Sequence, residues 1–217
     1  MEQNNFNDLL TKGLDILQIS YTEKMLENVN AFFRLYQEWN KKKASLSSIL
    51  DEKEFITRHL LDSLTPINYL KSIQYLKSST RCVDLGAGGG FPGVPIKIFQ
   101  PKINLDFAEV KQKKICFLNE VILNLPLLGV NVIDTSIGKV KPNYQLLFTR
   151  AFGSLQKICH EARMYIKKGF IVAYKGKKDK INEEIEQLST HIQKRTHVHK
   201  VETPFLDEER HLVIIDL

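Results

Sequence analysis

The spacing of apolar residues divides the chain into a helical beginning and an alternating remainder. Over residues 1–80 the apolar positions recur with the period of an amphipathic helix. The longest such stripe consists of Met25, Leu26, Val29, Phe32, Phe33, Tyr36 and Trp39. Two pairs, Ser20 with Glu23 and Asp51 with Glu54, have the spacing of a capping box, which marks a helix start. The pattern therefore predicts a helical region over residues 1–80.

After residue 80, short apolar runs alternate with helical patterns. Strands are predicted at 81–85, 103–109, 130–135, 144–149, 169–174, 195–201 and 210–216. Helices are predicted at 92–100, 111–125, 154–167 and 179–193. Strands that alternate with helices predict a mostly parallel sheet covered on both faces. Only about 8 residues separate the last two strands, which is too short for a parallel crossover, so the last strand is expected to run antiparallel to its partner.

A glycine-rich turn follows the first predicted strand. Residues 83–93 read Val-Asp-Leu-Gly-Ala-Gly-Gly-Gly-Phe-Pro-Gly, and glycine lets a nucleotide-like cofactor lie against bare backbone. Gly86 and Gly88 match the first two glycines of the dinucleotide fingerprint, but Phe91 stands in the third position. Glu109 closes the second strand, where a carboxylate can accept hydrogen bonds from a ribose. For Phe91, core packing and a place over the cofactor both stay open.

The Asp-x-Gly-x-Gly-x-Gly turn, the acid at the next strand end and the antiparallel finish together resemble S-adenosylmethionine-dependent methyltransferases. The resemblance implies an α/β, Rossmann-like class I fold over residues 81–217, with seven mostly parallel strands and an antiparallel last strand. Residues 1–80 are then a small N-terminal helical extension. An NAD-binding oxidoreductase stays open as an alternative, because the ribose contact is common to both cofactors.

Charge and composition narrow the partner and the compartment. The net charge is +6; residues 1–80 sum to zero, residues 81–200 carry +10, and the last 17 residues carry −4. Such a basic excess favours a polyanionic partner, although a basic soluble surface explains it equally well. No apolar run approaches the roughly 20 residues that span a bilayer, and the first residues lack the pattern of a signal peptide. Three distant cysteines without a Cys-x-x-Cys pair predict buried thiols, no zinc or other metal site and a cytoplasmic protein.

Six segments carry a closer resemblance. They are Trp-Asn-Lys at 39–41, Arg-His-Leu-Leu-Asp-Ser at 58–63, Gly-Gly-Gly-Phe-Pro-Gly-Val-Pro at 88–95, Thr-Arg-Ala-Phe-Gly-Ser at 149–154, Tyr-Lys-Gly at 174–176 and Glu-Arg-His-Leu-Val-Ile at 209–214. In this order and spacing they resemble the RsmG family, also called GidB. These bacterial enzymes methylate N7 of a guanine, guanine 527, in the 16S rRNA of the small ribosomal subunit. The chain is accordingly expected to bind 16S rRNA or the small subunit, and to act as a monomer.

The same resemblance implies a set of contacts to S-adenosyl-L-methionine. These are Gly86, Phe91, Glu109 for the ribose, the backbone at Ile137 and Gly138, and Arg150, with Gly88 added from the glycine turn. The family usually has an Arg-x-Glu-Glu-like run where this chain has Ser-Ile-Gly-Lys at 136–139. The resemblance therefore implies only backbone contacts of Ile137 and Gly138 to the adenine, and none from acidic side chains.

Guanine N7 has a free lone pair, so its methylation needs no general base, and catalysis can come from holding N7 against the methyl carbon. No catalytic residue is predicted; Arg150 and Lys175 are the candidates for positioning. Arg150 suits the cofactor or an RNA phosphate, with a strand-end ion pair as the plainer alternative. Phe152 suits base stacking or core packing equally well, whereas His59 is expected to be a hydrogen-bonded packing residue.

Two sequence patterns favour a ring nitrogen as the methyl acceptor. Transfer to an exocyclic amine favours an Asn/Asp-Pro-Pro-Tyr loop after the fourth strand, and this chain has Thr-Arg-Ala-Phe at 149–152. Transfer to a carbon needs a cysteine nucleophile, often beside a proline, and none of the three cysteines adjoins one. A methyltransferase acting on another substrate and a non-enzymatic RNA-binding protein remain alternatives.

Overall fold

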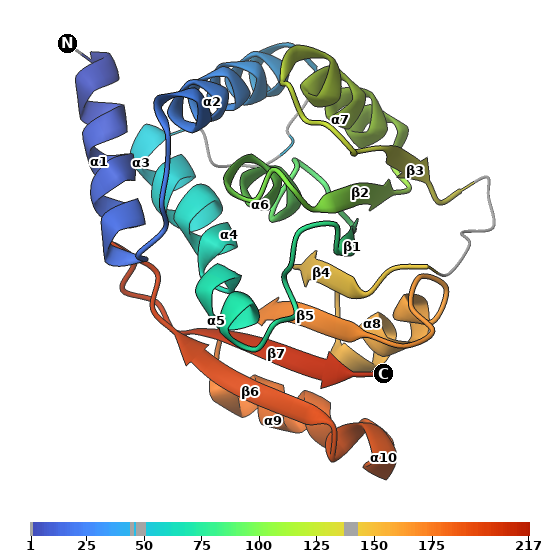
Figure 1. Cartoon of the computed structure of the whole chain (residues 1–217). Coiled ribbons are helices and arrows are strands. Elements are labelled where there is room, and N and C mark those ends of the chain that lie inside the picture. Colours follow the sequence, from blue (N-terminus) through green and yellow to red (C-terminus); the bar gives the residue numbers. More distant parts are fainter. Residues whose placement is uncertain (1, 44–45, 47–50, 137–142) are drawn as a thin grey trace.

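The computed structural model describes residues 2–43, 46, 51–136 and 143–217, and Figure 1 shows their arrangement. At its centre lies a seven-stranded sheet with the order β3-β2-β1-β4-β5-β7-β6. The strands are β1 (Arg81–Leu85), β2 (Asn104–Glu109), β3 (Val132–Asp134), β4 (Leu146–Arg150), β5 (Phe170–Lys175), β6 (Thr196–Val201) and β7 (Arg210–Asp216). Every predicted strand is present, and its boundaries lie within two residues of the prediction.

The directions of the strands follow the prediction as well. β7 runs antiparallel to both β5 and β6, whereas the other neighbouring strands are parallel. The sequence order also reverses beside β1, which pairs with β2 on one side and β4 on the other. Such a switch point opens a crevice at the carboxyl ends of the strands, where ligands of open α/β sheets bind.

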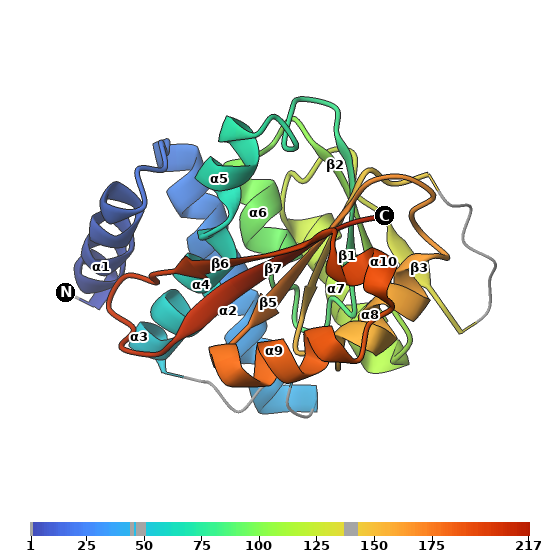
Figure 2. The same ribbon diagram turned by 90° about the horizontal axis from the view of Figure 1, so that it is seen from below.

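Helices cover both faces of this sheet. α6 (Gly93–Phe99) and α7 (Gln112–Asn124) share one face with the N-terminal helices, and α8 (Leu155–Ala162), α9 (Lys178–Glu186) and α10 (Thr190–Gln193) cover the other. Figure 2 shows α5 and α6 on the opposite side of β5 and β7 from α9. The buried residues form two clusters that alternate along each central strand, as a pleated strand buried on both faces requires.

The prediction of one helix over 179–193 is wrong. The chain breaks between α9 and α10, where Leu188 is buried and Ser189 has extended dihedrals. The side-chain amide of Gln193 donates to the carbonyl oxygens of Glu186 and Leu188, which satisfies acceptors left free at the end of α9. The break brings both Leu188 and Ile192 into the core cluster under this face.

The N-terminal region is helical, as predicted. It comprises α1 (Glu2–Ile16), α2 (Glu23–Lys43), α3 (Glu52–Glu54), the π-helix η1 (Phe55–Leu61), α4 (Asp62–Leu64) and α5 (Ile67–Ser72). Asp51 caps α3, since its Oδ1 accepts from the amide of Glu54 at 2.9 Å. The predicted start at Ser20 is wrong, because α2 begins at Glu23 and the Thr22 hydroxyl, not that of Ser20, accepts from the amide of Met25 at 3.3 Å.

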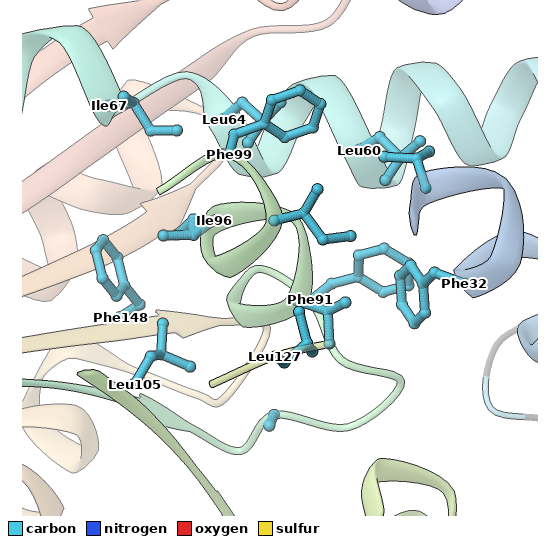
Figure 3. Close-up of a cluster of buried hydrophobic side chains, with 14 of the residues drawn as sticks. Phe32, Leu60, Leu64, Ile67, Phe91, Ile96, Phe99, Leu105, Leu127 and Phe148 are labelled. Atoms are coloured by element: carbon cyan, nitrogen blue, oxygen red, sulfur yellow. The ribbon is translucent and has the colours of Figure 1, made fainter. Parts of the chain in front are cut away.

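Aromatic side chains join this region to the sheet. Phe32 and Tyr36 of α2 contact Phe55, Phe91 and Phe117, with ring centroids 5.1–6.4 Å apart. Figure 3 shows Phe32 beside Phe91, and Leu60 and Leu64 on the helix that lies across α6. The N-terminal helices therefore share one core with the sheet. Among the described helices, none is long and apolar enough to cross a membrane.

Candidate functional site

The glycine turn lies at the carboxyl end of β1, in the crevice of the sheet. Gly86 has a φ of 73° and its amide donates to the carbonyl oxygen of Ala108 at 2.9 Å, which ties the turn to the end of β2. Gly88 has a φ of 59°, and a Cβ there would meet nothing closer than the Lys114 Nζ at 3.4 Å. Glycine is thus required at Gly88 by its left-handed backbone, and the open space leaves room for a ligand against the peptide.

Asp84 lies beneath this turn and is fully buried. Its Oδ2 accepts from the amide of Gly93 at 2.8 Å, while its Oδ1 has no hydrogen-bond partner in the described part of the chain. Burial raises the pKa of Asp84 to about 7, against the lowering effects of the Gly93 hydrogen bond and the Arg150 charge. The side chain therefore caps the turn. Its unpartnered oxygen also suits a cationic ligand group.

Glu109 ends β2 directly beside the turn. It is only 5% exposed, so it is not a solvated acid. Its Oε2 accepts from the amide of Gly88 at 3.0 Å, and its Oε1 accepts from the amides of Val110 and Lys111 at 2.8 and 2.9 Å. The structure therefore brings Gly88 and Glu109 together, as the sequence predicts. Val110, which sequence reasoning missed, exposes an apolar side chain next to them.

Arg150 ends β4 and reaches across to the N-terminal helices. Its NH1 donates to the Oδ2 of Asp62 at 3.0 Å and to the carbonyl oxygen of Arg58 at 3.1 Å. Its NH2 lies 3.0 Å from the Nδ1 of His59. The strand-end ion pair, named above as the plainer alternative, is thus present. The contact of Arg150 with a cofactor or with RNA stays a prediction.

His59 and Phe91 form a stacked pair beside Arg150. Their ring centroids lie 4.4 Å apart with an interplanar angle of 16°, and the Arg150 guanidinium carbon lies 5.4 Å from the Phe91 ring centre. Because arginine only donates, the Nδ1 of His59 is the acceptor and carries no proton. Burial and the Arg150 charge lower the pKa of His59 to about 3. His59 is therefore the hydrogen-bonded packing residue that was predicted. Phe91 is packed into the core cluster, and its contact with a cofactor stays a prediction.

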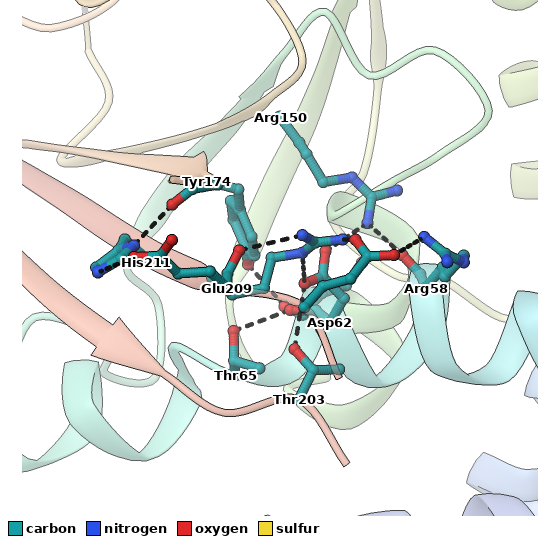
Figure 4. Close-up of polar contacts among 12 residues, drawn as sticks. Arg58, Asp62, Thr65, Arg150, Tyr174, Thr203, Glu209 and His211 are labelled. Atoms are coloured by element: carbon teal, nitrogen blue, oxygen red, sulfur yellow. Dashed lines mark hydrogen bonds and ion pairs between the residues drawn. The ribbon is translucent and has the colours of Figure 1, made fainter. Parts of the chain in front are cut away.

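Arg150 also lines a cavity of about 400 Å³. Its walls come from four separate segments, 58–62, 150–151, 174–176 and 210–211, together with Val201. These are parts of four of the segments that carry the family resemblance. Figure 4 shows Arg150, Asp62 and Arg58 in one set of polar contacts, with Tyr174 and His211 beside it. The ends of β4 and β5 and the start of β7 thus form a second compartment next to the glycine turn.

Asp62 is the central acid of this compartment, and no motif in the sequence had assigned it a role. It is 4% exposed, and its Oδ1 lies 3.3 Å from the Nε of Arg210 and accepts from the hydroxyl of Thr203 at 3.3 Å. One carboxylate therefore holds both Arg150 and Arg210. No local signal marked it, because its partners Arg150 and Arg210 lie far from it in the sequence.

The remaining candidates are held by local contacts. Lys175, at the end of β5, pairs with the Oε2 of Glu184 at 2.6 Å and donates to the carbonyl oxygen of Gly153 at 2.7 Å. Phe152 is half-buried and packs against the second core cluster, with the Lys157 Nζ 4.8 Å from its ring centre. Among the candidates named above, Lys175 lines the cavity and Phe152 does not.

Three predictions concern other parts of the chain. Ile137 and Gly138, expected to contact the adenine, lie outside the described residues. Cys82 and Cys159 are buried, whereas the prediction of a buried thiol is wrong for Cys116, which is exposed. Within residues 2–43, 46, 51–136 and 143–217, no group of three or more His, Cys, Asp or Glu side chains could hold a metal ion.

Comparison with known proteins matches one family. The model of rRNA small subunit methyltransferase G, GidB, matches residues 25–213. A relative named ribosomal RNA small subunit methyltransferase G from Desulforamulus reducens is 31% identical over 224 residues, which cover 98% of this chain and 90% of the relative. One of the same name from Francisella tularensis is 30% identical and is matched over 96% of both chains.

Solved structures show the same architecture. A methyltransferase from Pyrococcus furiosus has a TM-score of 0.54 at 16% identity, over 87% of this chain and 98% of that one. The methyltransferase domain of METTL16 has a TM-score of 0.54 at 14% identity, over 85% of this chain and 78% of that one. These likenesses confirm the predicted Rossmann-like methyltransferase fold.

Proposed function

The chain belongs to the GidB family, rRNA small subunit methyltransferase G, and we propose that it transfers a methyl group to N7 of guanine 527 in 16S rRNA. Family membership supports methylation of small-subunit rRNA, and the particular base and atom are the proposal. The observation that carries it is a two-part crevice. The glycine turn and Glu109 form one part, a cavity with several cationic side chains forms the other, and Arg150 lies between them.

S-adenosyl-L-methionine is the cofactor, and the turn is suited to it. Gly88 offers bare backbone, and Gly86, whose Cα packs against the ring of Phe152, is proposed to contact the cofactor beside it. Glu109 offers carboxylate oxygens to a ribose, and the unpartnered Oδ1 of Asp84 favours positive charge nearby. Phe91, Arg150 and the backbone at Ile137 and Gly138 complete the proposed cofactor contacts. When bound, the cofactor supplies an electrophilic methyl group on a positively charged sulfur.

The residues around the cavity support a reaction without a general base. His59 is neutral with a strongly lowered pKa, and its Nδ1 already accepts from Arg150, so it is poorly placed to take up a proton. Guanine N7 has no proton to lose. The chain's contribution is then to hold N7 in line with the methyl carbon, and we assign this positioning to Arg150 and Lys175.

The charge distribution supports an RNA partner. The excess of +10 over residues 81–200 includes the exposed Lys111, which occupies the N-cap position of α7, and Lys113 in its first turn, both close to Glu109 in the sequence. We propose that residues 81–217 form the methyltransferase domain and residues 1–80 a helical extension, and that the protein acts as a monomer in the cytoplasm on 16S rRNA or the small subunit.

The test is methylation of defined substrates. The purified protein is incubated with isotopically labelled S-adenosylmethionine and either naked 16S rRNA or small subunits lacking the modification, and the product is mapped by nuclease digestion and mass spectrometry. We expect a single N7-methylguanosine at guanine 527. Methyl transfer to another base or to another atom of guanine would overturn the proposal. Calorimetry with S-adenosylhomocysteine and with NADH separates the two cofactor classes, and only the first is expected to bind.

A further inference from the structure

Glu208 lies between two arginines at the rim of the cavity. Its Oε1 is 2.5 Å from the NH1 of Arg58, and its Oε2 is 2.7 Å from the NH2 of Arg210. The two arginines come from segments about 150 residues apart, the π-helix η1 and the start of β7. Glu208 belongs to the loop between β6 and β7, and its side chain is 37% exposed. One carboxylate of a surface loop is therefore held by two converging guanidinium groups.

Each arginine has a second acidic partner besides Glu208, and the one that holds Arg210 is buried. The Nε of Arg210 lies 3.3 Å from the buried Asp62, and the Nε of Arg58 lies 3.3 Å from Glu54, one turn earlier in the helix. Each arginine thus uses one side of its guanidinium for an acid on or near the helix η1 and presents another N–H to Glu208. Because Glu208 is partly exposed, its ion pairs are screened and contribute little to stability. A competing anion can replace it at small cost.

The ligand class follows from the donors and from their place. Guanidinium groups bind phosphate oxygens with matched, charge-assisted hydrogen bonds. The pair lies at the rim of a cavity of about 400 Å³ next to the cofactor turn. A nucleotide whose base enters this cavity carries its phosphates at the rim. We propose that Arg58 and Arg210 form a phosphate subsite for the RNA strand, and that the carboxylate of Glu208 occupies this subsite until an RNA phosphate displaces it.

This inference rests on the proposed function and adds a control on it. The loop that bears Glu208 is acidic, with Glu202, Asp207 and Glu209 beside it, in a chain that is otherwise basic. Any polyanion must displace the carboxylate before it reaches the arginines. An RNA that also places a base in the cavity gains contacts there, and these offset the free energy needed to displace Glu208. An RNA bound only through its phosphates gains no such contacts. The loop therefore favours the correctly seated nucleotide over nonspecific binding.

The test measures binding of the full-length protein to a 16S rRNA fragment that the wild-type protein methylates. Fluorescence anisotropy is recorded at several KCl concentrations. Glu208→Gln is expected to tighten binding about three- to fivefold, the factor that corresponds to release of an exposed ion pair. Arg58→Gln and Arg210→Gln are each expected to weaken binding and to reduce the slope of log affinity against log salt by about 0.7, the value for one lost phosphate contact.

Asp207→Asn is the matched control, because it removes the same charge from the neighbouring position of the same loop. It separates the loss of the Glu208 ion pairs from a general change in the electrostatic potential of the loop. We expect the change in log affinity for Asp207→Asn to be less than half of that for Glu208→Gln. In the double variant Arg58→Gln/Arg210→Gln, the effect of Glu208→Gln should shrink to that of the control.

Equal effects of Glu208→Gln and Asp207→Asn would overturn the inference, as would weaker binding by Glu208→Gln in a protein with native thermal stability. If the wild-type protein methylates the fragment while either result is obtained, the proposed function stands and the phosphate subsite fails. If the wild-type protein methylates neither the fragment nor small subunits, the proposed function fails, and the inference fails with it.

Discussion

The two parts of the crevice are built by different means. The proposed cofactor side is made of one short stretch of backbone, in which the turn after β1 is fastened to the end of β2 through the Glu109 carboxylate. The cavity side is made of charged side chains from four distant segments, and Asp62 holds two of the arginines. The first part depends on backbone conformation, and the second on charge balance. Substitutions should therefore damage the two parts independently and in different ways.

The largest effect, a loss of unfolding free energy, is expected from Asp62→Ala, which disrupts the charged side chains around the cavity. It leaves the guanidinium groups of Arg150 and Arg210 without their buried partner. Removal of one member of a buried ion pair costs about 3–5 kcal/mol, and we expect about 3 kcal/mol because Arg210 is 23% exposed. Urea unfolding measures this loss. Asp15→Asn, at an exposed position near the end of α1, is the control, and a loss for Asp62→Ala no larger than its own would contradict the role of Asp62.

The next largest effect, a loss of cofactor affinity, is expected from Glu109→Gln, which weakens the hydrogen bonds that hold the glycine turn. One acceptor oxygen is lost and an amide donor then faces backbone N–H groups that now bond to the carboxylate. Hydrogen bonds to charged groups contribute about 1.5–3 kcal/mol, so the affinity for S-adenosylhomocysteine should fall roughly 10- to 100-fold. Calorimetry measures the change. Glu183→Gln, on an exposed side of α9, removes the same charge from the opposite face of the sheet. An affinity within twofold of wild type would remove Glu109 from the cofactor site.

The smallest expected effect is a pH dependence of cofactor binding caused by Asp84. This carboxyl group lies beneath the glycine turn, so it tests whether charge also matters on the side of the crevice that is built from backbone. Its pKa is raised to about 7 by burial, so the carboxylate is mostly protonated at pH 6 and mostly ionised at pH 8. If the ionised form binds the cationic cofactor, its affinity for S-adenosylmethionine should increase about tenfold over this interval. Asp84→Asn should abolish this dependence. An equally steep increase in that variant would assign it to another group.

The same group affects stability with the opposite sign. The pKa of Asp84 in the folded protein lies above the ordinary aspartate value of 3.8, so the native state binds more protons than the unfolded state between about pH 4 and 7. The unfolding free energy contributed by Asp84 therefore declines as the pH rises through this window. Asp84 thus weakens the fold at the pH at which it favours the cofactor.

Sequence reasoning succeeded where the information was local. The strands and the glycine turn lie in contiguous stretches, and the link between Gly88 and Glu109 follows from the adjacency of β1 and β2. The break at Leu188 was missed because a continuous helical period does not reveal that one buried leucine must turn into the core. The start of α2 was misplaced because Ser20 and Thr22 are both good capping residues, and only the backbone path selects Thr22.

The cavity side was not predictable in the same way. Asp62, Arg150, Arg210 and Glu208 meet only after the chain has folded, over separations of up to about 150 residues. The family resemblance pointed to most of the segments that carry these residues. It did not show that Arg150 and Arg210 share the carboxylate of Asp62. The partners of a charged side chain are decided by tertiary packing, and no local period carries that information.

One contact at the seam between the helical region and the sheet has a practical consequence. Trp39 is the only tryptophan of the chain; it is 7% exposed, it contacts Phe117, and its indole N–H donates to Glu120 of α7 at 2.8 Å. Its fluorescence therefore reports on that seam alone, whereas circular dichroism sums over all the helices. If both signals trace one unfolding curve, the helical region and the sheet melt as a unit. If the emission shifts first, the helical region can detach while the sheet persists, and a single intrinsic fluorophore has revealed it without any label.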